Sequence, residues 1–115
     1  MQRYALVVGI SEYDDSNLGS LSRTVGDADT VAQLLQEFGG YRITKLTKRV
    51  IRSQLVAALK QLLQQQGEAQ DVLIYYTGHG LTVIDPDDDS QEGYLAASDC
   101  TITVEDGKAI EQSKG

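Results

Sequence analysis

Two runs of consecutive apolar residues, at positions 4–10 and 72–76, dominate the hydrophobic pattern of this chain. Neither run alternates with polar residues, and both are rich in β-branched, aliphatic and aromatic side chains. Such runs are typical of strands in a parallel sheet that is covered on both faces. We therefore expect strands at 4–10 and 71–77, and we expect the second of them to be central in the sheet. A shorter strand is predicted at 41–46, where apolar and polar residues alternate.

Two amphipathic helices are predicted between these strands. The apolar residues of the first recur at positions i, i+3, i+4 and i+7 and are Val31, Leu34, Leu35 and Phe38. Asp27 and Asp29 lie in its first turn, where carboxylates stabilise the helix dipole, and Gly39-Gly40 ends it. The apolar residues of the second helix are Ile51, Leu55, Ala58, Leu59 and Leu62. We interpret both stripes as faces that pack on the core.

The element order is therefore β-α-β-α-β, with connections long enough for right-handed parallel crossovers. Short apolar pieces at 81–84 and 94–97 flank an acidic turn and predict a small β-hairpin. A second hairpin is predicted around the turn at 105–107. The fold class is α/β, with a mostly parallel sheet flanked by helices.

Composition and charge narrow the class of protein. At 115 residues the chain forms one domain, and its hydrophobic content of 41% is typical of a globular protein. The net charge of −7 argues against nucleic acid or an anionic membrane as a general partner. No apolar run approaches the roughly 18 residues of a membrane span. Because the N-terminal residues fit no signal peptide and a single cysteine forms no internal disulfide, we expect a cytoplasmic protein.

His79 is the only histidine, and it follows the predicted strand at 71–77 almost directly. It stands between Gly78 and Gly80, just beyond the carboxyl end of a strand, where open α/β sheets carry their chemistry. An unperturbed imidazole titrates at about pH 6.5 and suits general acid/base catalysis. The alternative is a structural or an exposed histidine without a catalytic role.

Four segments in a fixed order, 4–10, 26–28, 71–80 and 93–99, carry a resemblance to a known family. Together they resemble the large-subunit portion of caspase-like cysteine peptidases, and most closely the metacaspases and the bacterial orthocaspases. The resemblance covers essentially the whole chain. It implies the caspase–haemoglobinase fold, incomplete here, and a Cys-His dyad that hydrolyses peptide bonds in protein or peptide substrates.

The resemblance also implies roles for three residues. His79 matches the catalytic histidine, which assists thiolate formation and protonates the leaving amine. The backbone N–H of Gly80 matches an oxyanion donor. Asp27 matches the aspartate in the metacaspase pocket for the residue before the cut bond, which implies cleavage after Arg or Lys. The alternative is that Asp27 only stabilises the helix dipole; the second aspartate of the family pocket, near the nucleophile, has no match here.

The chain departs from the family at the nucleophile. The family's cysteine lies on the next core strand, in an Asp-x-Cys-x-x-Gly-like segment that this sequence does not contain. The only thiol, Cys100, comes too soon after His79, because residues 80–99 hold no crossover to a neighbouring parallel strand. We interpret Cys100 as incidental, with a regulatory thiol or the nucleophile as alternatives. We expect residues 1–115 to be the large-subunit portion of a caspase-like catalytic domain, truncated before the nucleophilic cysteine and inactive alone.

The uncovered edge of the predicted sheet supports the same expectation. Three parallel strands and two helices leave an edge beside His79 without a partner, and such edges are normally paired or shielded. We therefore expect further chain, or a partner, to supply the nucleophile-bearing remainder of the caspase-like domain.

No cofactor is required with certainty, but the acidic turn at 85–92 is a candidate Ca²⁺ site. Several metacaspases need this ion, and hard cations take oxygen ligands. The candidate ligands are Asp85, Asp87 and Asp89. Their spacing resembles the start of an EF-hand loop, but Ser90 replaces the required glycine and Ala96 replaces the bidentate glutamate. The alternative is a solvated acidic turn. Weaker candidates by family position are Asp99, Glu105 and Asp106.

Two functions from different classes remain open. The first is a caspase-like cysteine endopeptidase, which explains why a histidine lies between two glycines. The second is a non-catalytic caspase-like interaction domain, or pseudo-protease, which the missing cysteine favours nominally. A buried strand that ends in a cysteine just after Gly115 would decide for the enzyme. A histidine-based hydrolase or a metal site would need further ligands, which a single histidine does not supply.

Overall fold

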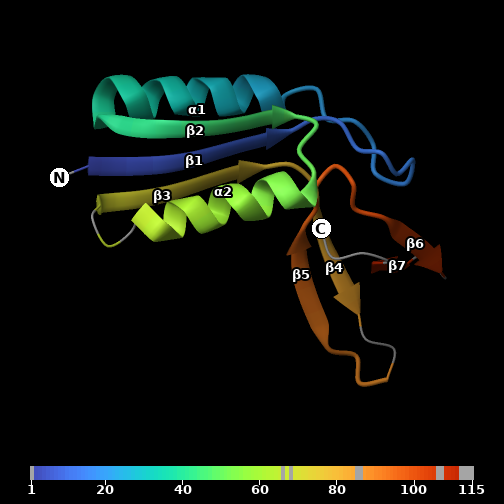
Figure 1. Cartoon of the computed structure of the whole chain (residues 1–115). Helices are drawn as coiled ribbons and strands as arrows, with labels where there is room; N and C mark the ends of the chain where they lie inside the picture. The colour runs from blue at the N-terminus through green and yellow to red at the C-terminus, as the bar shows by residue number, and fades with distance from the viewer. Residues whose placement is uncertain (1, 66, 68, 85–86, 106–107, 112–115) are drawn as a thin grey trace.

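The computed structural model describes residues 2–65, 67, 69–84, 87–105 and 108–111. The first elements are β1 (Gln2–Ile10), α1 (Thr24–Gly39), β2 (Tyr41–Lys48), α2 (Arg52–Gln65) and β3 (Ala69–Thr77). Short strands follow them: β4 (Gly80–Ile84), β5 (Gln91–Leu95), β6 (Ile102–Glu105) and β7 (Lys108–Glu111). In Figure 1 the first group forms a layered unit, and the short strands lie to one side of it.

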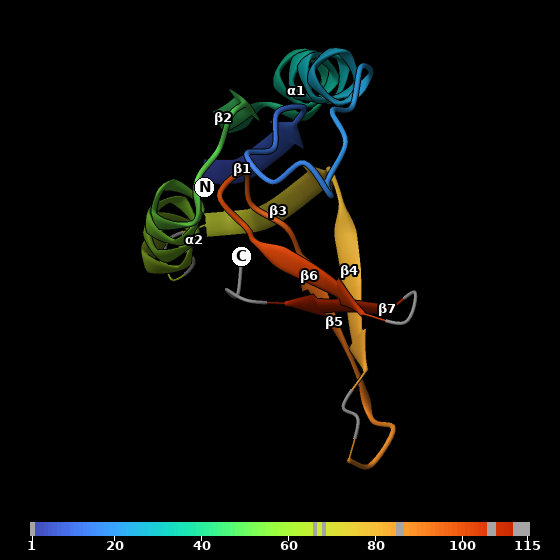
Figure 2. The ribbon, with the colours of Figure 1, turned by 90° about the vertical axis from the view of Figure 1, so that its right-hand side faces the viewer.

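The sheet is parallel, with its strands in the order β2-β1-β3. Leu6 of β1, for example, lies opposite Thr44 of β2 and Ile74 of β3. Helix α1 covers one face of the sheet and helix α2 lies on the other (Figure 1, Figure 2). This arrangement is the α/β class that the sequence predicts. Because the strands are parallel, their carboxyl ends meet at one edge, and the loops at that edge form the candidate site.

Strand β1, and not β3, takes the central position. Among the described strands, β3 pairs only with β1, whereas β1 has a partner on each side. Ile74, in the middle of β3, is 54% exposed, while Val7 and Val8 of β1 are fully buried. The prediction that 71–77 is a central strand is therefore wrong for the described part of the chain. An uninterrupted apolar run therefore does not by itself distinguish a central strand from one at the side of the sheet.

Alternate side chains of β1 build a core on each face of the sheet. The core on the α2 face holds Leu6, Val8, Ile10, Val50 and Leu62. The core on the α1 face holds Val7, Ala28 and Ala32. Gly9 allows α1 to approach closely, because a Cβ at this position would lie 2.6 Å from both the Cβ of Ala28 and the carbonyl oxygen of Thr24. The start of α1 is thereby fixed against the end of β1.

The prediction that the apolar stripe of α1 packs on the core is wrong. Leu34 is 51% exposed and Phe38 is 81% exposed, although Leu35 does pack against the core. The buried residues of α1 are instead Thr24, Ala28 and Ala32. Small residues four positions apart let the helix lie close to the sheet, which turns the larger side chains away from it. The stripe of α2 is confirmed for Leu55, Ala58, Leu59 and Leu62, which pack on the core, whereas Ile51 precedes the helix and is not part of that core.

Both predicted hairpins are confirmed. Strand β4 pairs with β5 and β6 pairs with β7, each in antiparallel register. The sequence predicts Ala96 and Ala97 within the second strand, but β5 ends at Leu95, so these two buried residues belong to the loop that follows it. The hairpins extend away from the carboxyl end of β3 (Figure 2). In the described part of the chain, no helix is long and apolar enough to cross a membrane.

Candidate functional site

The candidate site lies where the carboxyl ends of β1, β2 and β3 meet (Figure 1). Strand β3 ends at Thr77, and His79 follows after Gly78. The predicted position of His79, just beyond a strand end, is therefore confirmed. Residues of the loop 11–23, which leaves β1, and of the segment 96–100, which follows β5, make hydrogen bonds to His79.

The imidazole of His79 is held by the loop that leaves β1. Its Nε2 lies 2.7 Å from the carbonyl oxygen of Gly19. Because a carbonyl oxygen only accepts hydrogen bonds, Nε2 must carry the hydrogen, and Nδ1 of the neutral ring keeps its lone pair. The ring of Tyr13 packs edge-on against the imidazole, with 4.7 Å between the ring centroids. The imidazole thus has a defined tautomer, with one basic nitrogen.

The main chain of His79 is held as closely as its ring. Its N–H donates to the hydroxyl oxygen of Tyr13 at 2.8 Å, and its carbonyl accepts from the N–H of Ala96 at 2.9 Å. The hydroxyl of Tyr76 lies 3.0 Å from the same carbonyl and 2.8 Å from that of Ala96. Burial above all, and then the hydrogen bond with Tyr13, raise the pKa of Tyr76. The phenol of Tyr76 therefore stays protonated and remains a donor.

The segment 96–100 ties the hairpin to the start of α2. Ser98 is fully buried, and its Oγ accepts a hydrogen bond from the N–H of Val50 at 2.7 Å. The N–H of Ser98 donates in return to the carbonyl of Val50 at 2.7 Å. Asp99 Oδ1 accepts from the N–H of Arg52, the first residue of α2, at 2.9 Å. Asp99, a weaker Ca²⁺ candidate in the sequence, therefore caps a helix in the structure.

An ion pair supports the loop that carries Tyr13 and Gly19. The guanidinium of Arg49 donates to both carboxylate oxygens of Asp14, at 3.0 and 2.6 Å. This hydrogen bonding holds the pKa of the Asp14 carboxyl below its usual value. The N–H of Asp14 also donates to the carbonyl of Ser98 at 2.9 Å. The loop is thus anchored to Arg49, which directly follows β2, and to the segment 96–100.

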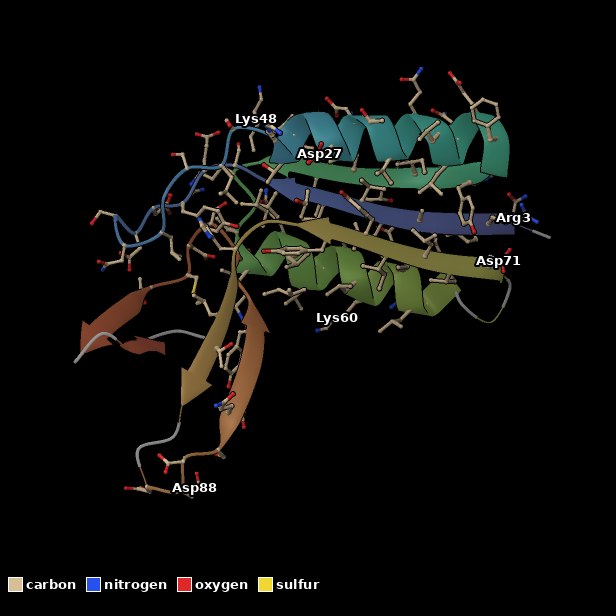
Figure 3. All side chains as sticks on the ribbon, turned by 180° about the vertical axis from the view of Figure 1, so that it is seen from behind. Arg3, Asp27, Lys48, Lys60, Asp71 and Asp88 are labelled. Atoms are coloured by element: carbon tan, nitrogen blue, oxygen red, sulfur yellow. The ribbon has the colours of Figure 1, made fainter. Side chains whose placement is uncertain are left out.

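Asp27 lies in the first turn of α1, at the sheet edge that carries the site, and its side chain is exposed (Figure 3). An open cavity of about 400 Å³ lies beside this turn. Its lining residues are Ser11, Glu12, Ser20, Leu21, Ser22, Val25 and Lys48. Because Asp27 is not among them, the structure does not bring its carboxylate into the cavity. Two roles of Asp27 stay predictions: binding of a basic substrate side chain, and stabilisation of the helix dipole.

The candidate Ca²⁺ ligands are only partly described. Asp87 and Asp89 are exposed in the turn between β4 and β5, and Asp85 lies outside the described residues. Asp88 in the same turn accepts a hydrogen bond from the N–H of Ser90 at 2.9 Å, which lowers the pKa of its carboxyl. Among the described residues, no group of three acidic, histidine or cysteine side chains is placed to hold a metal ion. The Ca²⁺ site stays a prediction.

Cys100 lies in a buried apolar cluster and is 1% exposed. The other buried members of the cluster are Leu18 and Ala96. An apolar environment disfavours the thiolate, which is the nucleophilic form of cysteine. The position agrees with the interpretation of Cys100 as a small buried hydrophobe.

The fold and the site together define the class of this protein. The chain is an α/β domain with a histidine just beyond the end of a parallel strand, and a backbone carbonyl sets the tautomer of this histidine. A comparison with protein families then gives the family, since the caspase domain matches residues 2–112. The chain belongs to the caspase domain family, a family of cysteine peptidases. The search of curated proteins finds no match.

Proposed function

We propose that this chain supplies the histidine of a Cys-His dyad in a cysteine endopeptidase of the metacaspase or orthocaspase kind. The observation that carries the proposal is the hydrogen bond between Nε2 of His79 and the carbonyl of Gly19. A general base needs a nitrogen with a lone pair and a ring in a defined orientation. The Gly19 carbonyl provides both, because it keeps the hydrogen on Nε2 and leaves Nδ1 basic.

In this mechanism His79 takes the proton of a cysteine thiol, and the thiolate attacks the carbonyl carbon of the peptide bond. The imidazolium then gives its proton to the leaving amine, which leaves an acyl-enzyme for hydrolysis by water. The N–H of Gly80 donates to the oxyanion of the tetrahedral intermediate. Gly80 is exposed, and the nearest atom to a Cβ built there is the carbonyl oxygen of Tyr94, 3.8 Å away, so a substrate carbonyl has room to approach.

The nucleophile comes, in this proposal, from the remainder of the caspase-like domain, which pairs with the outer edge of β3. Two observations on the described residues support this assignment. Strand β3 has no partner on that edge among the described strands, and its Ile74, which shares the α2 face of the sheet with Val72 and Tyr76, is half exposed. A strand added in parallel beside β3 would end next to His79. The burial of Cys100 also supports a nucleophile from elsewhere.

The proposed specificity is for Arg or Lys before the cut bond, with Asp27 pairing with the basic side chain. Its support is an exposed carboxylate at the start of α1, near the carboxyl edge of the sheet. Since Asp27 does not line the cavity beside it, the nucleophile-bearing segment must complete the specificity pocket.

Two substitutions of His79 in the full-length protein test the proposed function. His79→Ala should lower kcat for an Arg-terminated fluorogenic peptide by about 10²–10⁴-fold, the usual contribution of a positioned acid/base. His79→Gln is the sharper variant, because its amide can still donate to Gly19 but has no basic nitrogen. An unchanged kcat in His79→Gln would reduce His79 to a structural residue. If the unmodified full-length protein shows no turnover, the non-catalytic interaction domain is the better function.

A further inference from the structure

We propose that Tyr13 and Tyr76 are positioning residues that fix the main chain of His79, and we call this pair the tyrosine clamp. The inference rests on the proposed function, since positioning matters only if His79 transfers protons. Tyr13 comes from the loop after β1, and Tyr76 comes from the end of β3. The clamp therefore connects the carboxyl ends of the neighbouring strands β1 and β3 through His79, which lies just beyond β3.

One tyrosine hydroxyl contacts the N–H of His79 and the other contacts its carbonyl oxygen. The hydroxyl oxygen of Tyr13 accepts from the N–H of His79 at 2.8 Å. The hydroxyl of Tyr76 donates between two carbonyls, at 3.0 Å from His79 and 2.8 Å from Ala96. Donor and acceptor of His79 are therefore both occupied by tyrosines. A phenylalanine at position 13 would leave the His79 N–H partly buried without this acceptor.

The identity of residue 78 is an independent observation for the clamp. A Cβ built on Gly78 would lie 2.6 Å from the hydroxyl oxygen of Tyr76 and 2.7 Å from that of Tyr13. Both distances are far below van der Waals contact, so any side chain at position 78 would displace the hydroxyls. Gly78 is thus required by the close approach of two tyrosines, and no positive φ is needed to explain it.

The clamp also connects the two contacts of the imidazole. Tyr13 packs its ring edge-on against the imidazole while its hydroxyl holds the main chain of the same residue. The loop that carries Tyr13 also brings the carbonyl of Gly19 to Nε2. One loop therefore fixes both the ring and the main-chain N–H of His79, and Tyr76 of β3 adds a hydrogen bond to the His79 carbonyl. A displacement of about 1 Å at a catalytic group can cost on the order of 10²-fold in rate.

The single histidine makes the test direct, because every imidazole signal of the chain belongs to His79. In the unmodified chain, NMR should show a protected His79 amide and a visible, slowly exchanging imidazole N–H resonance. Tyr13→Phe and Tyr76→Phe should each speed amide exchange at His79 and broaden the imidazole N–H resonance by exchange with water. Tyr75→Phe is the matched control, since this β3 residue packs on the α1 face and its hydroxyl has no hydrogen-bond partner among the described residues.

Kinetics of the full-length enzyme separate positioning from a general loss of structure. Each clamp variant should lower kcat by about 10–10²-fold with KM unchanged, while Tyr75→Phe leaves both unchanged. Unchanged NMR signals of His79 in both clamp variants would overturn the clamp even if His79 proves catalytic. Altered NMR signals in an inactive full-length protein would keep the clamp and overturn the proposed function. If a variant does not fold, the unmodified chain still provides a test. Exchange of its His79 amide at the rate of an unprotected amide would overturn the tyrosine clamp.

Discussion

At the scale of single residues, Asp27 can be tested for two roles that predict opposite results. If its carboxylate pairs with a substrate Arg, Asp27→Asn in the full-length enzyme leaves that charge unpaired when bound. Loss of one member of a buried pair costs about 3–5 kcal/mol, so kcat/KM for Arg substrates should fall by on the order of 10²-fold or more, with Tm nearly unchanged.

Asp29 provides the matched control for this experiment. It lies two positions further along α1, and its carboxylate forms an exposed ion pair with Lys45 at 2.7 Å. Asp29→Asn should change neither kcat/KM nor Tm appreciably, because exposed pairs contribute little. If Asp27 only stabilises the helix dipole, Asp27→Asn lowers Tm slightly and Arg cleavage persists. Retained Arg preference with normal kinetics would end the pocket assignment.

The sequence located His79 but not the residues that orient it. A histidine between two glycines after an apolar run is a local pattern, and local patterns can be found in a single sequence. The Gly19 carbonyl and the Tyr13 hydroxyl are 60 and 66 residues away from His79 along the chain. A backbone carbonyl has no sequence signal at all, and one tyrosine in a polar loop has little. Only the strand order brings them together.

At the scale of elements, the contact between β1 and α1 predicts a contrast between two glycines. Gly9→Ala would place a methyl group 2.6 Å from Ala28 and from the backbone of Thr24, so α1 must move away from the sheet. The expected cost is about 1–3 kcal/mol of unfolding free energy, as for overpacked cores. Gly26→Ala in the same helix meets no atom within 4 Å and should stabilise by about 0.5–1 kcal/mol.

Urea denaturation of the two variants checks this contrast. Equal stability of Gly9→Ala and the unmodified chain would show that α1 does not pack closely on β1.

The close contact between α1 and β1 also explains why the core face of α2 was predicted correctly and that of α1 was not. Helix α2 buries leucines, which a hydrophobic pattern detects, whereas α1 buries Thr24, Ala28 and Ala32, which such a pattern ranks low. The pattern instead includes the large apolar Phe38 in the core face of α1, although this side chain is exposed.

At the scale of the whole molecule, the sheet has a buried centre and an open side. Strand β1 is covered on both faces and both edges, while β3 has an unpaired outer edge among the described strands and an exposed Ile74. Periodicity identified every strand of the sheet but not the strand order. Both β1 and β3 have continuous apolar sequences, so the position of each in the sheet depends on pairing between distant segments, which one sequence does not reveal.

Residues 1–115 by themselves should have no peptidase activity. The proposal requires a thiol beside His79, and the only thiol of the chain is buried in an apolar cluster. The purified chain should therefore hydrolyse Arg- or Lys-terminated fluorogenic peptides no faster than buffer does. Cys100→Ala should give the same background, since in this proposal the nucleophilic thiol comes from another segment. Robust turnover that Cys100→Ala abolishes would contradict both the role given to Cys100 and the need for a segment on the outer edge of β3.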